Sequence, residues 1–133
     1  MSLGEAPDAD DVEELLRERH GVPADQPLKV ELGLREGRPR LILRLDRPAR
    51  ATRPIERYLL DVSHLRQGER PAWDLVLDAT DALLGTLLES GYAYRDLPTG
   101  SDVEYEGAVF WVEAECLRPD LERAADQLLG GDN

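Results

Sequence analysis

The stretch Leu28–Asp46, which reads LKVELGLREGRPRLILRLD, decides the fold. Apolar residues recur at every second position over 28–34 and again over 41–45, and this period of two is typical of strands that bury one face. The segment 36–39, EGRP, lies between the two runs and is rich in turn-forming residues. Because two strands joined by so short a turn form an antiparallel hairpin, this stretch predicts the first hairpin of a sheet.

Outside this hairpin, hydrophobic periodicity and helix-capping residues predict six further elements. They are a helix over 8–20, a strand over 55–63, a helix over 73–90, a hairpin with strands over 103–106 and 108–115, and a last helix that starts at Pro119. The predicted order is α-β-β-β-α-β-β-α, which indicates an α+β fold, a two-layer antiparallel sheet with helices on one face. We interpret 1–133 as a single domain whose residues 1–7 are a flexible or vector-derived start.

The composition is that of an acidic folded chain. Its 133 residues are 41% hydrophobic and carry a net charge of -12, which disfavours nucleic acid and anionic membranes and favours a basic or apolar partner. The single cysteine, Cys116, fits a reducing cytoplasm, and no stretch approaches the roughly 18 apolar residues of a membrane span. The strong preference for arginine over lysine is interpreted as bacterial codon bias.

Positive charge is concentrated in one part of the chain. From Arg35 to Arg57 eight arginines accompany only three acids, a net charge of +5, whereas the remaining residues carry -17. Three interpretations stay open: the arginines pair with acidic helices of the same molecule, they dock a second copy or an acidic peptide, or they contact phosphate or nucleic acid. Few aromatic residues are interleaved with them, which disfavours a nucleic-acid partner. The candidate partner-binding arginines are Arg44, Arg47, Arg50 and Arg53.

Aromatic residues gather in the segment 92–111, which holds five of the seven in the chain. Because neighbours along a strand point to opposite faces, Phe110 and Trp111 are expected on opposite sides of the sheet. One of them then faces the helices, while the other lies at an interface or under a second covering layer. The candidate partner-binding aromatic residues are Tyr94, Tyr105, Phe110 and Trp111.

Catalytic chemistry is hard to place on this sequence. It has no nucleophile elbow of the Gly-x-Ser-x-Gly type, and the acid next to Cys116 opposes thiolate formation. Asp61 and His64 are residue types found in metal and acid–base sites, but the spacing implies no third group. No catalytic residue, metal site or cofactor is therefore predicted. One predicted helix carries an acidic stripe, interpreted as a solvated face: Asp74, Asp78 and Asp81.

The element order, the small size and the acidity resemble those of the type III secretion chaperones and their relatives of the same fold. The resemblance covers nearly the whole chain, but no sequence motif carries it, and no residue role is transferred. It implies a dimer that holds a partner chain in extended form against apolar surface patches. The many arginines around the first hairpin depart from that family and leave the type of partner open.

These observations predict a small acidic cytoplasmic domain that binds a protein partner or a second copy of itself, as an adaptor or chaperone-like homodimer more than as an enzyme. Two alternatives stay open. One is a small-molecule-binding or enzymatic domain with a carboxylate-rich cleft around Asp61, His64 and the segment 92–106. The other is electrostatic partner binding through the arginine-rich hairpin. The sequence identifies neither the partner nor the pathway.

Overall fold

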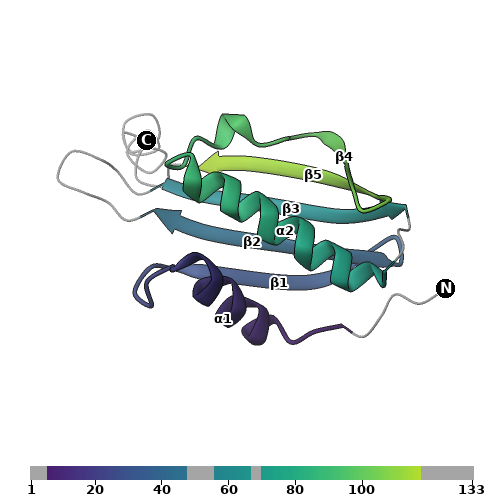
Figure 1. Ribbon diagram of the computed structural model, residues 1–133, viewed down its shortest axis with the longest axis horizontal. Helices are drawn as coiled ribbons and strands as arrows, with labels where there is room; N and C mark the ends of the chain where they lie inside the picture. The colour runs from purple at the N-terminus through teal and green to yellow at the C-terminus, as the bar shows by residue number, and fades with distance from the viewer. Residues whose placement is uncertain (1–5, 48–55, 67–69, 118–133) are drawn as a thin grey trace, which may run out of the picture.

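The computed structural model describes residues 6–47, 56–66 and 70–117. Within them the elements follow the order α-β-β-β-α-β-β, and the predicted helix from Pro119 falls outside the described residues. Five strands form one open antiparallel sheet, and Figure 1 shows both helices on the same face of it. The predicted α+β fold class is thereby confirmed. The elements are α1 (Ala9–His20), β1 (Leu28–Arg35), β2 (Arg38–Arg47), β3 (Glu56–Arg66), α2 (Ala72–Glu89), the short 3-10 helix η1 (Tyr94–Asp96), β4 (Ser101–Tyr105) and β5 (Ala108–Leu117).

The strands lie in the order β1-β2-β3-β5-β4, and every neighbouring pair is antiparallel. Helix α2 connects β3 to β4, and the second hairpin then returns β5 to the side of β3. Strand β3 continues to Arg66, beyond the predicted end at 63, because its pairing with β5 carries it past the polar residues Ser63 and His64. A register shift between His64 and Arg66 marks a bulge at this end of β3.

Both hairpins turn on the same dipeptide, Glu-Gly. Glu36 and Gly37 have φ values of 53° and 77°, and Glu106 and Gly107 have values of 47° and 78°. Two central residues with positive φ are the mark of the type I′ turn, whose twist matches that of the strands it joins. The first turn is therefore two residues long, shorter than the predicted segment 36–39, and Pro39 belongs to β2.

The core lies between the sheet and α2 and is built from alternate strand residues. Leu41, Leu43 and Leu45 have no exposed surface, so the leucines that recur every second residue all face the helices. Each such side chain stabilises the fold by about 1.5–3 kcal/mol relative to an exposed one. The other strands and α2 complete this layer with Leu28, Val30, Tyr58, Leu60, Val62, Leu75, Val76, Leu84, Leu87, Phe110 and Val112.

Helix α1 begins and ends where its capping residues stand. The Asp10 N–H donates to Asp8 Oδ1 at 2.8 Å, and Gly21 follows the helix with a φ of 63°. The same helix protects the edge of the sheet, because the Val30 N–H of β1 donates to Glu13 Oε1 at 2.8 Å. A backbone donor on an edge strand is thus satisfied by a side chain and not by another strand.

The second type I′ turn gives a stability test with a matched control. A Cβ added at Gly107 or at Gly33 would meet nothing within 4 Å, but only Gly107 has a positive φ, 78°. We expect Gly107→Ala to lower the free energy of unfolding by about 1–2 kcal/mol, the cost of the left-handed conformation for an L-residue. Gly33→Ala should leave it unchanged or raise it. Urea unfolding of both variants measures the difference, and equal losses would contradict the turn assignment.

Candidate binding face

One side of the sheet is free of the two described helices. We call it the open face: it consists of the side chains at alternate strand positions that point away from α1 and α2. On β2 and β3 these are, for example, Ile42 and Leu59, which are half-buried. Antiparallel sheets commonly pack one face on a core and present the other outward. The open face is therefore a surface on which the described part of the chain can meet a partner.

Charge on the open face is polarised across the strands. The outward positions of β1 and β2 hold five basic and two acidic residues, whereas those of β4 and β5 hold four acidic and no basic residues. The sequence predicts that the basic first hairpin is set against acidic helices. On the open face, however, the acidic residues opposite the basic hairpin belong to β4 and β5. The residues are Lys29, Arg35, Arg38, Arg40, Arg44, Glu31 and Asp46 on one side, and Asp102, Glu104, Glu113 and Glu115 on the other.

Three arginines of the open face are paired within the sheet. Arg40 Nε donates to Asp61 Oδ1 at 2.9 Å, and Arg57 binds both oxygens of Asp46, at 2.8 and 3.1 Å. Arg44 lies 3.5 Å from the carboxylate of Glu31. All three acids belong to strands, so for these arginines the partner is the sheet and not a helix. The two bidentate cross-strand pairs, those of Arg40 and Arg57, fix the long side chains in place over the sheet.

An apolar diagonal crosses the open face between these ion pairs. Leu59 of β3 pairs with Arg44 of β2, so Ile42, two residues away on β2, is its diagonal neighbour. On the other side Leu59 pairs with Glu115, and Leu117 of β5 is the diagonal neighbour there. Diagonal neighbours on one face lie within reach of large side chains. The register therefore aligns Ile42, Leu59 and Leu117 across the three central strands.

The structure does not bring the predicted arginines together. Arg44 is on the open face, whereas Arg47 points to the other side, where its guanidinium carbon lies 4.7 Å from the centre of the Tyr92 ring. Arg50 and Arg53 lie outside the described residues. The alternation of neighbouring strand residues explains why positions 44 and 47, three apart, face opposite ways.

The predicted aromatic residues also separate. Phe110 is in the core with no exposed surface, while Trp111 is half-buried on the open face, which confirms that the two point to opposite sides. Tyr94 of η1 is 40% exposed and lies 6.3 Å from the Tyr58 ring, and Tyr105 ends β4 half-buried against the core. Of the four, Trp111 is the one that the open face presents.

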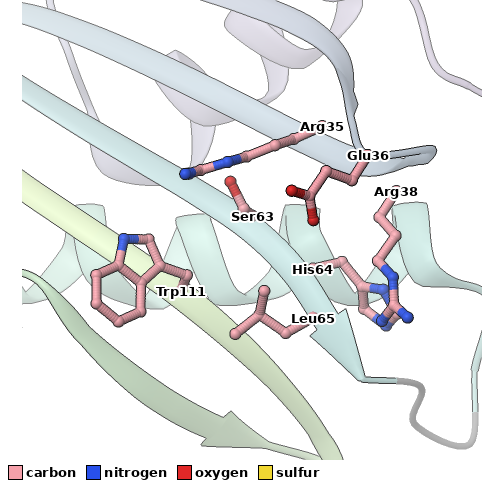
Figure 2. A pocket seen from close by; sticks show the side chains of 7 residues that line it. All are labelled: Arg35, Glu36, Arg38, Ser63, His64, Leu65 and Trp111. Atoms are coloured by element: carbon pink, nitrogen blue, oxygen red, sulfur yellow. The ribbon is translucent and has the colours of Figure 1, made fainter.

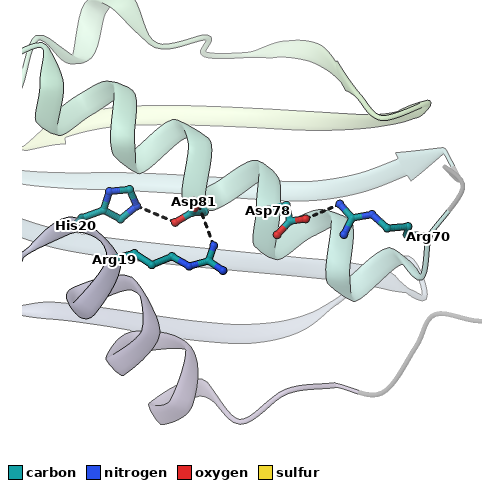
Figure 3. A network of polar contacts seen from close by, with 5 residues as sticks. All are labelled: Arg19, His20, Arg70, Asp78 and Asp81. Atoms are coloured by element: carbon teal, nitrogen blue, oxygen red, sulfur yellow. Dashed lines mark hydrogen bonds and ion pairs between the residues drawn. The ribbon is translucent and has the colours of Figure 1, made fainter.

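The acidic stripe of α2 makes contacts inside the molecule (Figure 3). Asp81 accepts from Arg19 Nη1 at 3.2 Å and lies 2.8 Å from His20 Nε2, so it ties the end of α1 to α2. Asp78 is paired with Arg70 at the start of α2. Within the described ranges, no three His, Cys, Asp or Glu side chains gather in a way that could hold a metal ion. Asp78 and Asp81 thus bind cationic side chains of the same molecule.

Asp61 and His64, considered together in the sequence, lie on opposite faces of β3. Asp61 is held by Arg40 on the open face, whereas the His64 ring packs edge-on against Phe110 at 5.8 Å between centroids. The carboxylate and the imidazole therefore do not form a pair that could share a proton or a metal.

A cavity of about 340 Å³ opens at the end of the sheet where the first hairpin turns (Figure 2). Residues of the first hairpin line one side of it, and residues of β3 and β5 line the rest. The lining residues are Arg35, Glu36 and Arg38 of the hairpin, Ser63, His64 and Leu65 near the bulge of β3, and Trp111 of β5. In Figure 2 the Ser63 hydroxyl points toward the side chain of Arg35. Arg35 and Arg38 belong to the arginine-rich segment of the sequence but were not among the candidate binding residues, and neither was Ser63, because only the pairing of β1, β2, β3 and β5 brings the three together.

No family model matches the chain, and neither the curated proteins nor the solved structures give a match. Neither described helix is long and apolar enough to cross a membrane.

Acidification should destabilise the fold through His64. Burial lowers the pKa of His64 from its ordinary 6.5, and the charge of Arg38 lowers it further. The backbone of Arg66 raises the pKa by less, and neither ring nitrogen has a partner at normal hydrogen-bond geometry. The unfolded chain therefore takes up the proton first, and stability is lost as the pH falls from 6.5 through the lowered pKa of the folded state. We expect the wild type to lose more free energy of unfolding than His64→Leu between about pH 8 and 5.

Urea titrations of the two proteins across this range measure the difference. Equal losses in both, or an NMR titration that places the His64 pKa at or above its ordinary 6.5, would contradict the burial of a neutral ring.

Proposed function

We propose that this chain is a protein-binding domain that docks its partner on the open face, and that a second copy of the chain is one such partner. The observation that carries the proposal is the polarity of this face, basic on the β1–β2 side and acidic on the β4–β5 side. The apolar diagonal of Ile42, Leu59 and Leu117 supplies area whose burial would drive association. The chaperone-like resemblance of the element order supports the same class of function.

A second copy fits this charge layout for a geometric reason. A two-fold axis parallel to the strands and close to β3 sets the β1–β2 side of one sheet against the β4–β5 side of the other. Opposite charges then meet on both sides, while the apolar diagonals meet near the axis, as an isologous interface requires. Sheets packed face to face keep their strands within about 30° of each other, which this axis allows.

Light scattering across a range of protein concentrations tests the proposal. We expect a concentration-dependent dimer in the wild type, and a shift toward monomer in Leu59→Asp, because this places a charge in the apolar diagonal. The matched control is Leu34→Asp: Leu34 is 62% exposed on β1 but does not belong to the open face. This variant should associate as the wild type does.

Charge reversal adds a test of the orientation. Arg44→Glu should weaken association, and the double variant Arg44→Glu with Glu115→Arg should restore part of it, since the charges are exchanged between the two sides. A wild type that stays monomeric at all concentrations, or equal effects of Leu59→Asp and Leu34→Asp, would overturn the proposal.

A further inference from the structure

The cavity at the first hairpin contains the polar groups that the fold itself leaves unused. Among the described residues, three buried side-chain polar atoms lack a hydrogen-bond partner: Ser63 Oγ, His64 Nδ1 and His64 Nε2. All three belong to consecutive residues that line this one cavity, and the two side chains are only 1% and 5% exposed. A buried hydroxyl or ring nitrogen without a partner costs about 1–3 kcal/mol, so such groups are rare in folded proteins and point to a polar occupant of the cavity, a water, an ion or a ligand.

The charge of the cavity indicates the class of ligand. In the part of the chain that the structure describes, Arg40, Arg44 and Arg57 each have an acidic partner, whereas Arg35 and Arg38 have none. Among the described residues that line the cavity, two unpaired guanidinium groups therefore stand against one carboxylate, that of Glu36. Guanidinium groups bind carboxylate and phosphate with charge-assisted, often bidentate hydrogen bonds.

The remaining wall favours a ligand with a flat apolar part. Trp111 lines the cavity on the open face, and its indole Nε1 already donates to Glu113 at 2.9 Å, which leaves the ring faces as the surface it can offer a ligand. The volume, about 340 Å³, is at the lower end of the range for small-molecule sites. The bulge in β3 is a further local feature of the kind that re-aims side chains beside binding sites.

We propose that this cavity binds a small organic anion, a phosphate or carboxylate group on a planar body. Arg35 and Arg38 hold the anionic group, the Ser63 hydroxyl donates a hydrogen bond to it, and Trp111 packs against the planar body. This site is separate from the apolar diagonal but lies on the open face, so a second copy docked there would cover it.

Phenyl phosphate, benzoate and inorganic phosphate are suitable probes, followed by NMR on the full chain. The chain has two tryptophans, and Trp73 is buried elsewhere, so its indole signal serves as an internal control. We expect phenyl phosphate or benzoate to shift the Trp111 indole signal saturably, with a Kd of about 1 mM or tighter. The stronger of the two identifies the anionic group, and inorganic phosphate should bind more weakly because it lacks the planar body.

Variants distinguish a built site from general attraction of anions. Arg35→Gln or Arg38→Gln should weaken binding about tenfold or more, and Ser63→Ala about fivefold. Arg95→Gln, which removes an equal charge from the exposed η1, should leave it unchanged. Ser63→Ala should not lower the free energy of unfolding without ligand, because the hydroxyl has no partner to lose.

The absence of saturable binding by all three probes would overturn the proposal, as would equal losses in Arg38→Gln and Arg95→Gln. Repeating the titration on Leu59→Asp separates this proposal from the docking of a partner. Leu59 does not line the cavity, so this variant, whose open face should stay uncovered, should bind the anion at least as well as the wild type.

Discussion

The antiparallel register of β2 with β3 and of β3 with β5 is the constraint on which the rest of the structure depends. In this register Leu43 stands opposite Leu60, and Leu60 opposite Ala114, so the buried positions of three strands share one face. A slip of one residue would turn that whole set outward, at a cost of several buried side chains. The burial of the leucines of β2 therefore also dictates which charges, arginines and aromatic rings stand on the open face.

Polarity and pairing of the open face both follow from this register. Arg40 meets Asp61 and Asp46 meets Arg57 because adjacent strands bring opposite charges side by side. The outward positions of β4 and β5 hold acids and no basic residue, so the two sides of the face differ in sign. The net charge of -12 hides this difference, and a partner would meet a local field that depends on which side it approaches.

Much of the fold could be predicted from the sequence, because its signals are local. The leucines at every second position of β2 fixed its strand and its buried face, and Asp8 and Gly21 marked the ends of α1. The first turn was predicted too long, since Glu36-Gly37 is not the Asn-Gly pair that announces a type I′ turn. The end of β3 was placed too early, because pairing with β5 overrides the polar character of His64.

The candidate sites could be predicted far less well, because they depend on contacts between distant segments. Phe110 and Trp111 were correctly assigned to opposite faces, but which of them was buried required the position of β5 in the sheet. The cavity joins Arg38, Ser63 and Trp111 across three strands, and no spacing along the chain indicates it. The sequence did contain one usable signal, the excess of arginines around the first hairpin. It did not show that, among the described ones, three bind acids while Arg35 and Arg38 are left without an acidic partner.

The most direct test of the open face as the binding surface is a map of backbone amide shifts at increasing protein concentration. A face-to-face pair of sheets predicts that the shifts concentrate on outward residues of the central strands, such as Ile42, Leu59 and Glu115, while amides of α1 and α2 stay unchanged. Shifts that concentrate on α1 and α2, or the absence of shifts at any concentration, would contradict the assignment of the open face as the binding surface.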